Sequence, residues 1–199
     1  MTRDELVFGI LTCTRCPLSL TRNMAVPAEA GKLYRTGGLG ILAEAPGAQE
    51  DATGRPMVGR AGQLLDRMLE AAGTSRKQVV ILNRIRCRPP DNRIKSPEAI
   101  AALAACDPWL QAELEEYNPT VVLLMGATAM EIVFGANPKV GLLAGTLRAT
   151  SADFQYGSRV WLATAHPAAV LRPNGAAWAE RVARDIFTAR KMVTEGVGP

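Results

Sequence analysis

A loop rich in glycine and proline connects an apolar strand to an amphipathic helix early in this chain. The strand ends with Gly40-Ile41-Leu42, and residues 63–72 repeat apolar side chains at helical spacing. Glycine permits unusual backbone angles and close approach, whereas proline removes backbone freedom. The loop contains Gly47, Gly54, Gly59, Gly62, Pro46 and Pro56. This composition predicts a loop with a fixed path that borders a pocket.

Strand and helix patterns alternate along the rest of the sequence. Four runs of β-branched or aliphatic residues, each closed by a polar or glycine-containing turn, are strand candidates: residues 39–44, 78–83, 120–125 and 160–164. Helices are expected over residues 61–72, 97–117, 127–135 and 176–193. This alternation predicts an α/β fold: one three-layer α/β/α domain over residues 1–199, with a four-stranded, largely parallel central sheet.

Composition and charge indicate where in the cell the protein is expected to act and what it is expected to bind. A chain of 199 residues with 48% hydrophobic content can bury a full core in one domain. Its apolar runs are short, and Arg3, Asp4 and Glu5 stand where a signal peptide would be apolar. We therefore expect a soluble, cytoplasmic monomer that does not contact membranes. The net charge of +4 is mild, but basic residues gather within residues 84–95, which favours phosphate contact.

Distinctive residues follow each of the four expected strands. Glu44 comes at the end of the first, Asn83 ends the second, Gly126 follows the third and His166 follows the fourth. Ligands of open parallel sheets bind outside the carboxyl ends of the strands. If the four strands are parallel, these residues meet at one edge of the sheet and form a site. His166 is the only histidine in the sequence, and a lone histidine is more often structural than catalytic.

Four cysteines provide a second set of candidate ligands. Cys13 and Cys16 form a C-x-x-C pair, while Cys87 and Cys106 stand apart. Disulfides are rare in cytosolic proteins. Four thiolates can bind zinc, although zinc ribbons usually pair two C-x-x-C units, and the same four can hold a [4Fe-4S] cluster. Spacing alone leaves both possibilities open.

Three motifs together resemble the family 4 uracil-DNA glycosylases. The glycine-rich loop matches the family pattern G-E-A-P-G, then E-D, then G-x-P-F-V-G-x-A-G-x-L-L, and it starts with Ala43-Glu44-Ala45-Pro46-Gly47. Residues 83–90 match the pattern N-x-x-K/R-C-R-P-P, and residues 166–172 match H-P-S/A-x-x-L-R. The resemblance extends over most of the chain, from Cys13 to Arg172.

This resemblance implies a monofunctional uracil-DNA glycosylase, which hydrolyses the bond between uracil and deoxyribose and leaves an abasic site. His166 would face uracil and donate a hydrogen bond to the negative charge that develops on the leaving ring. Glu44 would position or activate the attacking water, or stabilise the cationic sugar. The Asn83 amide would read the O4 and N3–H edge of uracil, because cytosine presents donor and acceptor in the opposite order.

The resemblance also implies roles for the residues around this site. Glu50 would support the pocket through a hydrogen bond to Asn92, whereas Asp51 is expected to be solvated or to cap the loop. The implied uracil-binding residues are Ala45, Gly47, Met57 and Asn83. The implied DNA-binding residues are Arg86, Arg88, Arg93, Val170, Leu171 and Arg172, of which the two apolar ones would fill the space left by the flipped base. A structural [4Fe-4S] cluster would be held by Cys13, Cys16, Cys87 and Cys106.

Two departures from the family pattern leave alternatives open. Ala43 replaces the first glycine of the loop motif, and Met57 stands where the family has a phenylalanine that stacks on uracil. Methionine covers a ring more flexibly and through a weaker contact. One alternative is a non-catalytic iron-sulfur module that binds damaged or single-stranded DNA. The other is a glycosylase for another deaminated base, such as hypoxanthine or xanthine.

Overall fold

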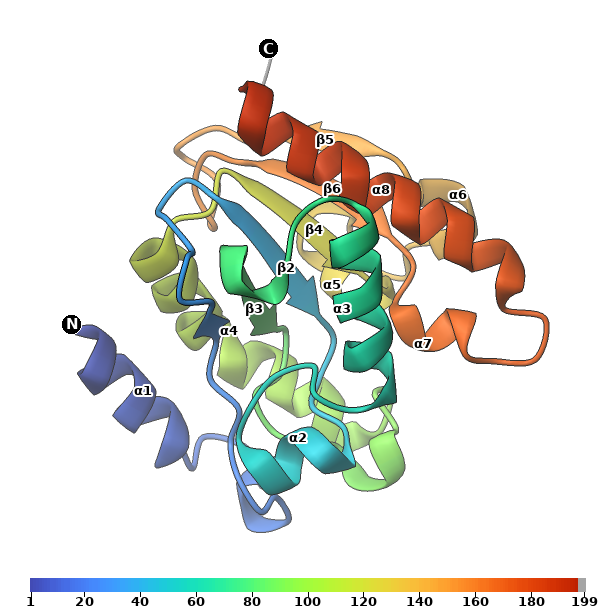
Figure 1. The fold of residues 1–199 in the computed structure, drawn as a ribbon. Coiled ribbons are helices and arrows are strands. Elements are labelled where there is room, and N and C mark those ends of the chain that lie inside the picture. The colour runs from blue at the N-terminus through green and yellow to red at the C-terminus, as the bar shows by residue number, and fades with distance from the viewer. Residues whose placement is uncertain (197–199) are drawn as a thin grey trace.

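The computed structural model describes residues 1–196 and contains a six-stranded sheet (Figure 1). Its strands are β1 (Glu29–Ala30), β2 (Leu39–Ala43), β3 (Val79–Asn83), β4 (Val121–Met125), β5 (Leu147–Ala149) and β6 (Val160–Thr164). They lie in the order β1-β3-β2-β4-β6-β5. The four central strands are parallel, whereas β1 and β5 pair antiparallel at the two edges.

The four central strands are those that the sequence predicts. Every residue of β2, β3 and β4 is buried, as expected for parallel strands that are covered on both faces. The edge strands β1 and β5 are too short to show an alternating pattern, and they raise the expected four strands to six. The α/β class and the parallel centre of the sheet are confirmed, and the strand count is corrected.

Helices connect the strands and cover both faces of the sheet. They are α1 (Arg3–Leu11), α2 (Ala48–Thr53), α3 (Arg60–Ala71), α4 (Pro97–Tyr117), α5 (Ala127–Phe134), α6 (Val140–Leu143), α7 (Pro167–Val170) and α8 (Ala176–Glu195), with short 3₁₀ helices η1 (Pro17–Leu20), η2 (Arg76–Gln78) and η3 (Pro90–Asn92). Figure 1 shows α3 and α8 on one face of the sheet and α4 and α5 on the other. The three expected layers are therefore present.

The ends of α4 show how the sequence determines a helix here. The Ser96 side chain accepts a hydrogen bond from the Ala99 amide at 3.2 Å and caps the start of the helix. Pro97 takes the first helical position, where the backbone N–H that proline lacks would have no partner within the helix. Asn118 ends the helix in the left-handed conformation, at a φ of 41°, and Pro119 cannot continue it. The helix expected over residues 97–117 is confirmed.

Three hydrophobic clusters hold these elements together. One lies between the sheet and the helices α3 and α8, and a second lies between the sheet and the helices α4 and α5. The third lies where α1 and η1 pack against α4. The buried residues of this third cluster include Leu6, Ile10, Leu18, Ala25, Ile85, Cys87 and Cys106. It therefore positions the N-terminal segment, with its two cysteines, beside the long helix.

Two expectations concern the chain as a whole. No helix within residues 1–196 is long and apolar enough to cross a membrane. The expectation of one domain over residues 1–199 stays a prediction, and residues 197–199 lie outside the described range.

Candidate active site

The carboxyl ends of the central strands form the edge at which the expected site residues gather. The parallel register sets Ala43 level with Asn83, so Glu44 and Asn83 lie at the ends of adjacent strands. Gly126 directly follows β4, and His166 lies two residues beyond β6, the parallel neighbour of β4. The parallel pairing confirms the predicted arrangement of these residues along one edge of the sheet.

Two cavities at this edge share the same pair of side chains. The larger, of about 540 Å³, is lined by Glu44, His166 and Met57 together with residues of the glycine-rich loop. This volume is within the range of small-molecule binding sites, roughly 300–1,000 Å³. The smaller, of about 390 Å³, is also lined by Glu44 and His166 and extends toward Gly126 and Trp178. The carboxylate and the imidazole therefore border both cavities.

Glu44 is held in place by the start of α5. Its Oε1 accepts a hydrogen bond from the Thr128 amide at 3.0 Å. Gly126 lies directly against the carboxylate, since a Cβ at that position would come within 2.7 Å of the Glu44 carboxyl carbon. Gly126 also has a φ of 95°, which favours glycine. The half-buried carboxylate therefore has a fixed position at the cavity wall.

His166 presents an uncharged imidazole to the cavities. Its Nδ1 accepts a hydrogen bond from the Ala168 amide at 3.1 Å, which places the ring proton on Nε2. Burial lowers the pKa of His166 below its usual value, and the Glu44 carboxylate opposes that shift. At neutral pH the ring is therefore a neutral N–H donor.

Glu50 holds the glycine-rich loop from within. Its buried carboxylate accepts hydrogen bonds from the backbone amides of Gly47 at 3.1 Å, Val58 at 2.8 Å and Gly59 at 2.7 Å. Because Gly47 lines the larger cavity, these bonds fix part of its wall. Glu50 supports the pocket as expected, but it does so through the backbone.

The structure changes two expectations about the neighbours of Glu50. Asn92 is exposed, and its Oδ1 accepts a hydrogen bond from Arg88 Nε at 2.8 Å instead of contacting Glu50. Asp51 is buried and not solvated, but it does cap a loop: it accepts hydrogen bonds from the Asn23 and Met24 amides and from the Asn23 side chain. The Asn92 contact is local, since Arg88 lies four residues earlier, whereas Asp51 binds a segment 28 residues away that no local pattern brings to it.

Met57 has an unusual backbone that its surroundings fix. Its φ is 51°, and its carbonyl accepts a hydrogen bond from the Arg76 guanidinium. A Cβ on Gly62 would lie 1.8 Å from the Met57 carbonyl oxygen, so only glycine fits at position 62. The Met57 side chain lines the larger cavity, where the resemblance places a uracil-stacking residue.

Asn83 is buried at the end of β3 and has an unmatched donor. Its Nδ2 has no hydrogen-bond partner in the part of the chain that the structure describes. A buried polar group left unpaired costs about 1–3 kcal/mol. Among the described residues, neither cavity is lined by Asn83 itself, although Glu44, at the end of the adjacent strand, lines both.

The arginines expected to bind DNA lie in different settings. Arg86 is only 2% exposed and forms an ion pair with Glu113 on α4, so the expectation that it contacts DNA is wrong. Arg88 is half-buried, whereas Arg93 is exposed. Arg172 is exposed and lines both cavities. The structure therefore leaves Arg93 and Arg172 with accessible guanidinium groups.

The segment after His166 separates its two apolar residues. Val170, at the end of α7, packs against the hydrophobic cluster beneath α8. Leu171 is 40% exposed. Of the expected wedge, Leu171 is thus the side chain that protrudes, next to exposed Arg172.

The four cysteines gather around the third hydrophobic cluster. Cys87 and Cys106 are buried, whereas Cys13 and Cys16 are half-buried. Burial raises the pKa of Cys87 to about 11; the Arg22 guanidinium opposes this shift, and the nearby Cys106 and Cys16 thiols add to it. Within residues 1–196, no three His, Cys, Asp or Glu side chains are grouped as a single metal ion would require.

Hydrogen-bond donors point at two of the cysteine sulfurs. Arg22 Nη1 donates to Cys87 Sγ at 3.0 Å, and Trp109 Nε1 donates to Cys13 Sγ at 3.3 Å. Sequence reasoning missed both donors, as it missed the Thr128 amide at Glu44. Each comes from a segment distant in sequence from its partner, so no local motif could have identified it.

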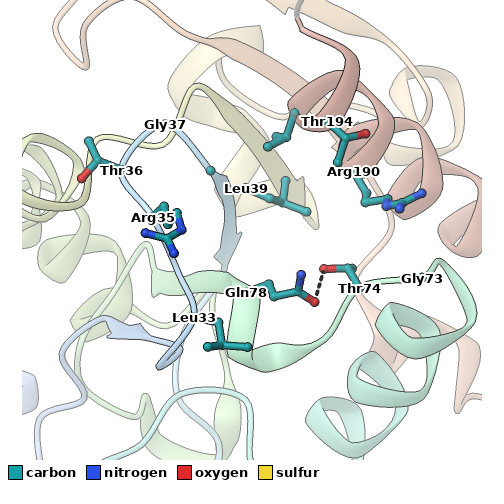
Figure 2. A pocket seen from close by; sticks show the side chains of 12 residues that line it. Leu33, Arg35, Thr36, Gly37, Leu39, Gly73, Thr74, Gln78, Arg190 and Thr194 are labelled. Atoms are coloured by element: carbon teal, nitrogen blue, oxygen red, sulfur yellow. Dashed lines mark hydrogen bonds between the residues drawn. The ribbon is translucent and has the colours of Figure 1, made fainter.

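A separate cavity of about 430 Å³ lies at the opposite edge of the sheet (Figure 2). It is lined by Leu39, the first residue of β2, and by Gln78, which directly precedes β3. Figure 2 shows Arg35 and Arg190 on different sides of this cavity. Its described lining includes none of the expected site residues, so the candidate site is the one at the carboxyl edge.

Comparisons with known proteins give the family of the chain. The model of the uracil DNA glycosylase superfamily matches residues 36–186. A type-4 uracil-DNA glycosylase of Thermotoga maritima is 38% identical over 96% of this chain and 97% of that protein. Those of Pyrobaculum aerophilum and Archaeoglobus fulgidus are 39% and 33% identical, over 82% and 86% of this chain and 81% and 84% of their own lengths. The chain therefore belongs to the type-4 uracil-DNA glycosylases, within the uracil-DNA glycosylase superfamily.

Proposed function

We propose that this chain is a monofunctional uracil-DNA glycosylase, which hydrolyses the N-glycosidic bond of deoxyuridine in DNA, releases uracil and leaves an abasic site. The observation that carries the proposal is the position of Glu44 and the neutral His166 on the wall shared by two cavities. The reaction needs a donor for the leaving base and a carboxylate for the sugar. This pair supplies both.

His166 stabilises the leaving group. Cleavage of the glycosidic bond leaves negative charge on the uracil ring, and a donor held against that charge favours the transition state over the ground state. The Ala168 amide fixes Nδ1 of His166, so Nε2–H is the donor that remains for uracil. Because burial lowers the pKa of His166, the ring gives this hydrogen bond as a neutral group.

Glu44 acts on the sugar side of the bond. The Thr128 amide holds one of its oxygens, and the carboxylate stabilises the cationic sugar or orients the attacking water. The smaller cavity, which Glu44 also borders, has room for that sugar or water. Glu44 therefore contributes charge at a fixed position.

Asn83 selects the base. Its amide can donate to O4 of uracil and accept from N3–H, and the orphan Nδ2 in the structure is the donor that O4 would satisfy. Cytosine presents a donor at that position and leaves the buried amide mismatched. Asn83 lines neither cavity among the described residues, so this assignment requires the uracil ring to reach past the lining that the structure shows.

The DNA contacts are assigned to the exposed residues around the cavities. Arg172 and Arg93 would bind phosphates, and Leu171 would enter the space left by the flipped nucleotide. Arg88 orients Asn92 at the same rim. A DNA substrate places the protein inside the cell. A monomer suffices for the reaction, because one chain carries every residue named here.

The cysteines are assigned to a [4Fe-4S] cluster. Donors on two sulfurs, from Arg22 and Trp109, suit thiolates that carry charge, and the third hydrophobic cluster encloses the site. The residues that would hold the cluster are Cys13, Cys16, Cys87 and Cys106. When bound, it supplies a cross-link between the N-terminal segment, the loop after β3 and α4.

Single-turnover excision from an oligonucleotide with one uracil tests the proposal. Abasic product is detected as strand cleavage after alkaline treatment. His166→Ala should fold and bind DNA but excise uracil roughly 10² to 10³ times more slowly, the usual effect of losing an oxyanion donor. Arg35→Ala, at the opposite edge of the sheet, is the control and should keep the full rate.

The same assay separates the alternatives. Oligonucleotides with hypoxanthine or xanthine in place of uracil report a glycosylase for another base. Wild-type protein that binds uracil DNA and leaves it intact would instead be a non-catalytic module. Full activity in His166→Ala would show that another group stabilises the leaving uracil.

A further inference from the structure

The segment between the C-x-x-C pair and β1 contacts both the cysteines and the glycine-rich loop. The Arg22 guanidinium donates to Cys87 Sγ at 3.0 Å and to the Leu11 carbonyl at 3.0 Å. Two residues later, the Met24 side chain packs against Gly54, where an added Cβ would lie 2.8 Å from the Met24 methyl carbon. Figure 1 shows this N-terminal segment passing beside α2.

Asp51 on α2 binds the middle of this segment. Its Oδ1 accepts hydrogen bonds from the Asn23 amide at 3.0 Å and the Met24 amide at 3.4 Å, and its Oδ2 accepts one from Asn23 Nδ2 at 2.6 Å. The side chain is only 2% exposed. A buried carboxylate with three N–H donors is a strong anchor, because removing it leaves the donors unpaired.

The adjacent residue on the same helix holds the pocket. Glu50 accepts hydrogen bonds from three backbone amides of the glycine-rich loop, including those on either side of the cavity-lining Met57 turn, at Gly47 and Val58. The helix α2 therefore carries two neighbouring carboxylates with different partners. Asp51 binds the cysteine segment, and Glu50 binds the wall of the pocket.

We propose that Asp51 is a positioning residue that couples the cysteine site to the uracil pocket through α2. The path runs from Cys87 Sγ through Arg22, Asn23 and Asp51 to Glu50 and the loop. This inference rests on the proposed function, since it needs a cluster on the cysteines and DNA at the pocket. Loss of the cluster would release the Arg22 segment and loosen the pocket.

The coupling acts in both directions. If an intact cluster favours DNA binding, bound DNA must favour retention of the cluster by the same factor, because coupling between two sites is reciprocal. Retention of iron can therefore report on the pocket without any measurement of catalysis. A residue that only stabilised the fold would change the rate of iron loss equally with and without DNA.

Iron release from the loaded protein tests the coupling. The visible absorbance of the cluster is followed after addition of an iron chelator, with and without a saturating duplex that carries one 2′-fluorodeoxyuridine, whose fluorine slows cleavage of the glycosidic bond. We expect this DNA to slow iron release from the wild type; because reciprocity holds for binding free energies, the factor in rate need not equal the equilibrium coupling factor. In Asp51→Ala, at DNA concentrations that saturate the variant, this protection should disappear.

Two further variants complete the design. Arg55→Ala is the matched control, because Arg55 lies on the same loop and makes two hydrogen bonds, at 2.7 and 2.8 Å, to Glu29 of β1. It should keep the full protection by DNA. Asn23→Ala removes only one of the three donors to Asp51, so it keeps the fold if Asp51→Ala does not, and it should lose part of the protection.

The outcomes that would overturn the inference are distinct from failure of the proposed function. Equal protection by DNA in the wild type and in the Asp51 and Asn23 variants would overturn the coupling, as would a wild type whose iron release ignores bound DNA. The proposed function would fail differently, with a wild type that holds no iron or leaves uracil in DNA.

Discussion

Under the proposed function, selection of uracil depends on one buried side chain, the amide of Asn83. Asn83→Asp keeps the shape of the residue but replaces the orphan Nδ2 donor with an oxygen, which would face O4 of uracil under the proposed function. Single-turnover excision of uracil should fall by about 10²-fold or more, because a buried mismatch leaves polar groups unpaired. Cluster absorbance and circular dichroism serve as controls for folding. An unchanged rate would mean that another residue selects the base.

Met57 can be altered without disturbing the backbone around it. Its left-handed φ is held by the Arg76 hydrogen bond to its carbonyl and by the close approach of Gly62, so the side chain is not what fixes the turn. Met57→Phe should therefore fold and present an aromatic face, which contributes about 1–3 kcal/mol of stacking per base. We expect tighter inhibition by free uracil and excision that is unchanged or faster. A collapse of excision would show that methionine shapes a different pocket.

The position of a functional residue could be predicted where the local sequence pattern determines it. Glu44 and His166 could be predicted because each lies within two residues of the end of a strand whose pattern shows where it ends. The environments of Arg86 and Asp51 could not, because each is buried by a partner from a distant segment: Glu113 on α4 and Asn23 near the N-terminus. Sequence shows the charge of such a residue but not the group that neutralises it.

At the scale of elements, a hydrogen bond fastens α8 to the end of β6. Thr164 Oγ1, at the last residue of the strand, donates to Asp185 Oδ2 at 2.7 Å, and both side chains are buried. Burial raises the pKa of Asp185 above its usual value, and the Thr164 hydrogen bond opposes the shift. Because His166 follows Thr164 by two residues, this contact also anchors the strand end that carries the imidazole.

The raised pKa of Asp185 predicts a pH dependence of stability. In the folded protein this carboxyl holds its proton at pH values where the unfolded chain has released it, so its contribution to stability is present at acid pH and is lost as pH rises through the folded pKa. Asp185→Asn keeps an acceptor for Thr164 and cannot ionise. The melting temperature of the variant, relative to wild type, should therefore increase from about pH 4 to about pH 7. A constant difference would mean that Asp185 does not titrate in this range.

The sequence predicts central elements better than peripheral ones. The strands β2, β3, β4 and β6 stand out because helices cover both of their faces and the strands are therefore almost wholly apolar. The edge strands β1 and β5 exist through pairing with β3 and β6, and their two and three residues carry no period of their own. The helix α2 was also missed, because its six residues are too few to show a helical period. Its acidic pair and its C-cap at Gly54 nevertheless mark its position.

At the scale of the whole molecule, the sheet and the cysteine site have separate cores. The two clusters that cover the faces of the sheet contain no cysteine among their described residues. The third cluster contains Cys87 and Cys106 and holds the N-terminal segment against α4. The third cluster also meets the pocket directly, because Ala45 and Ile94 pack against it and line the larger cavity.

This division predicts what removal of the metal does. Without a cluster to join them, residues 1–25 and the loop at residues 84–96 lose the cross-link within the third core, while the strands β2, β3 and β4 keep their own buried faces. Amide hydrogen exchange, measured by mass spectrometry on loaded and chelator-treated protein, should rise in the first two segments and stay slow in the strands. Cys87→Ser, prepared without a chelator, should reproduce this pattern. If exchange rises equally across the sheet, the cysteine site stabilises the entire fold, and the separation of cores inferred from packing does not hold in solution.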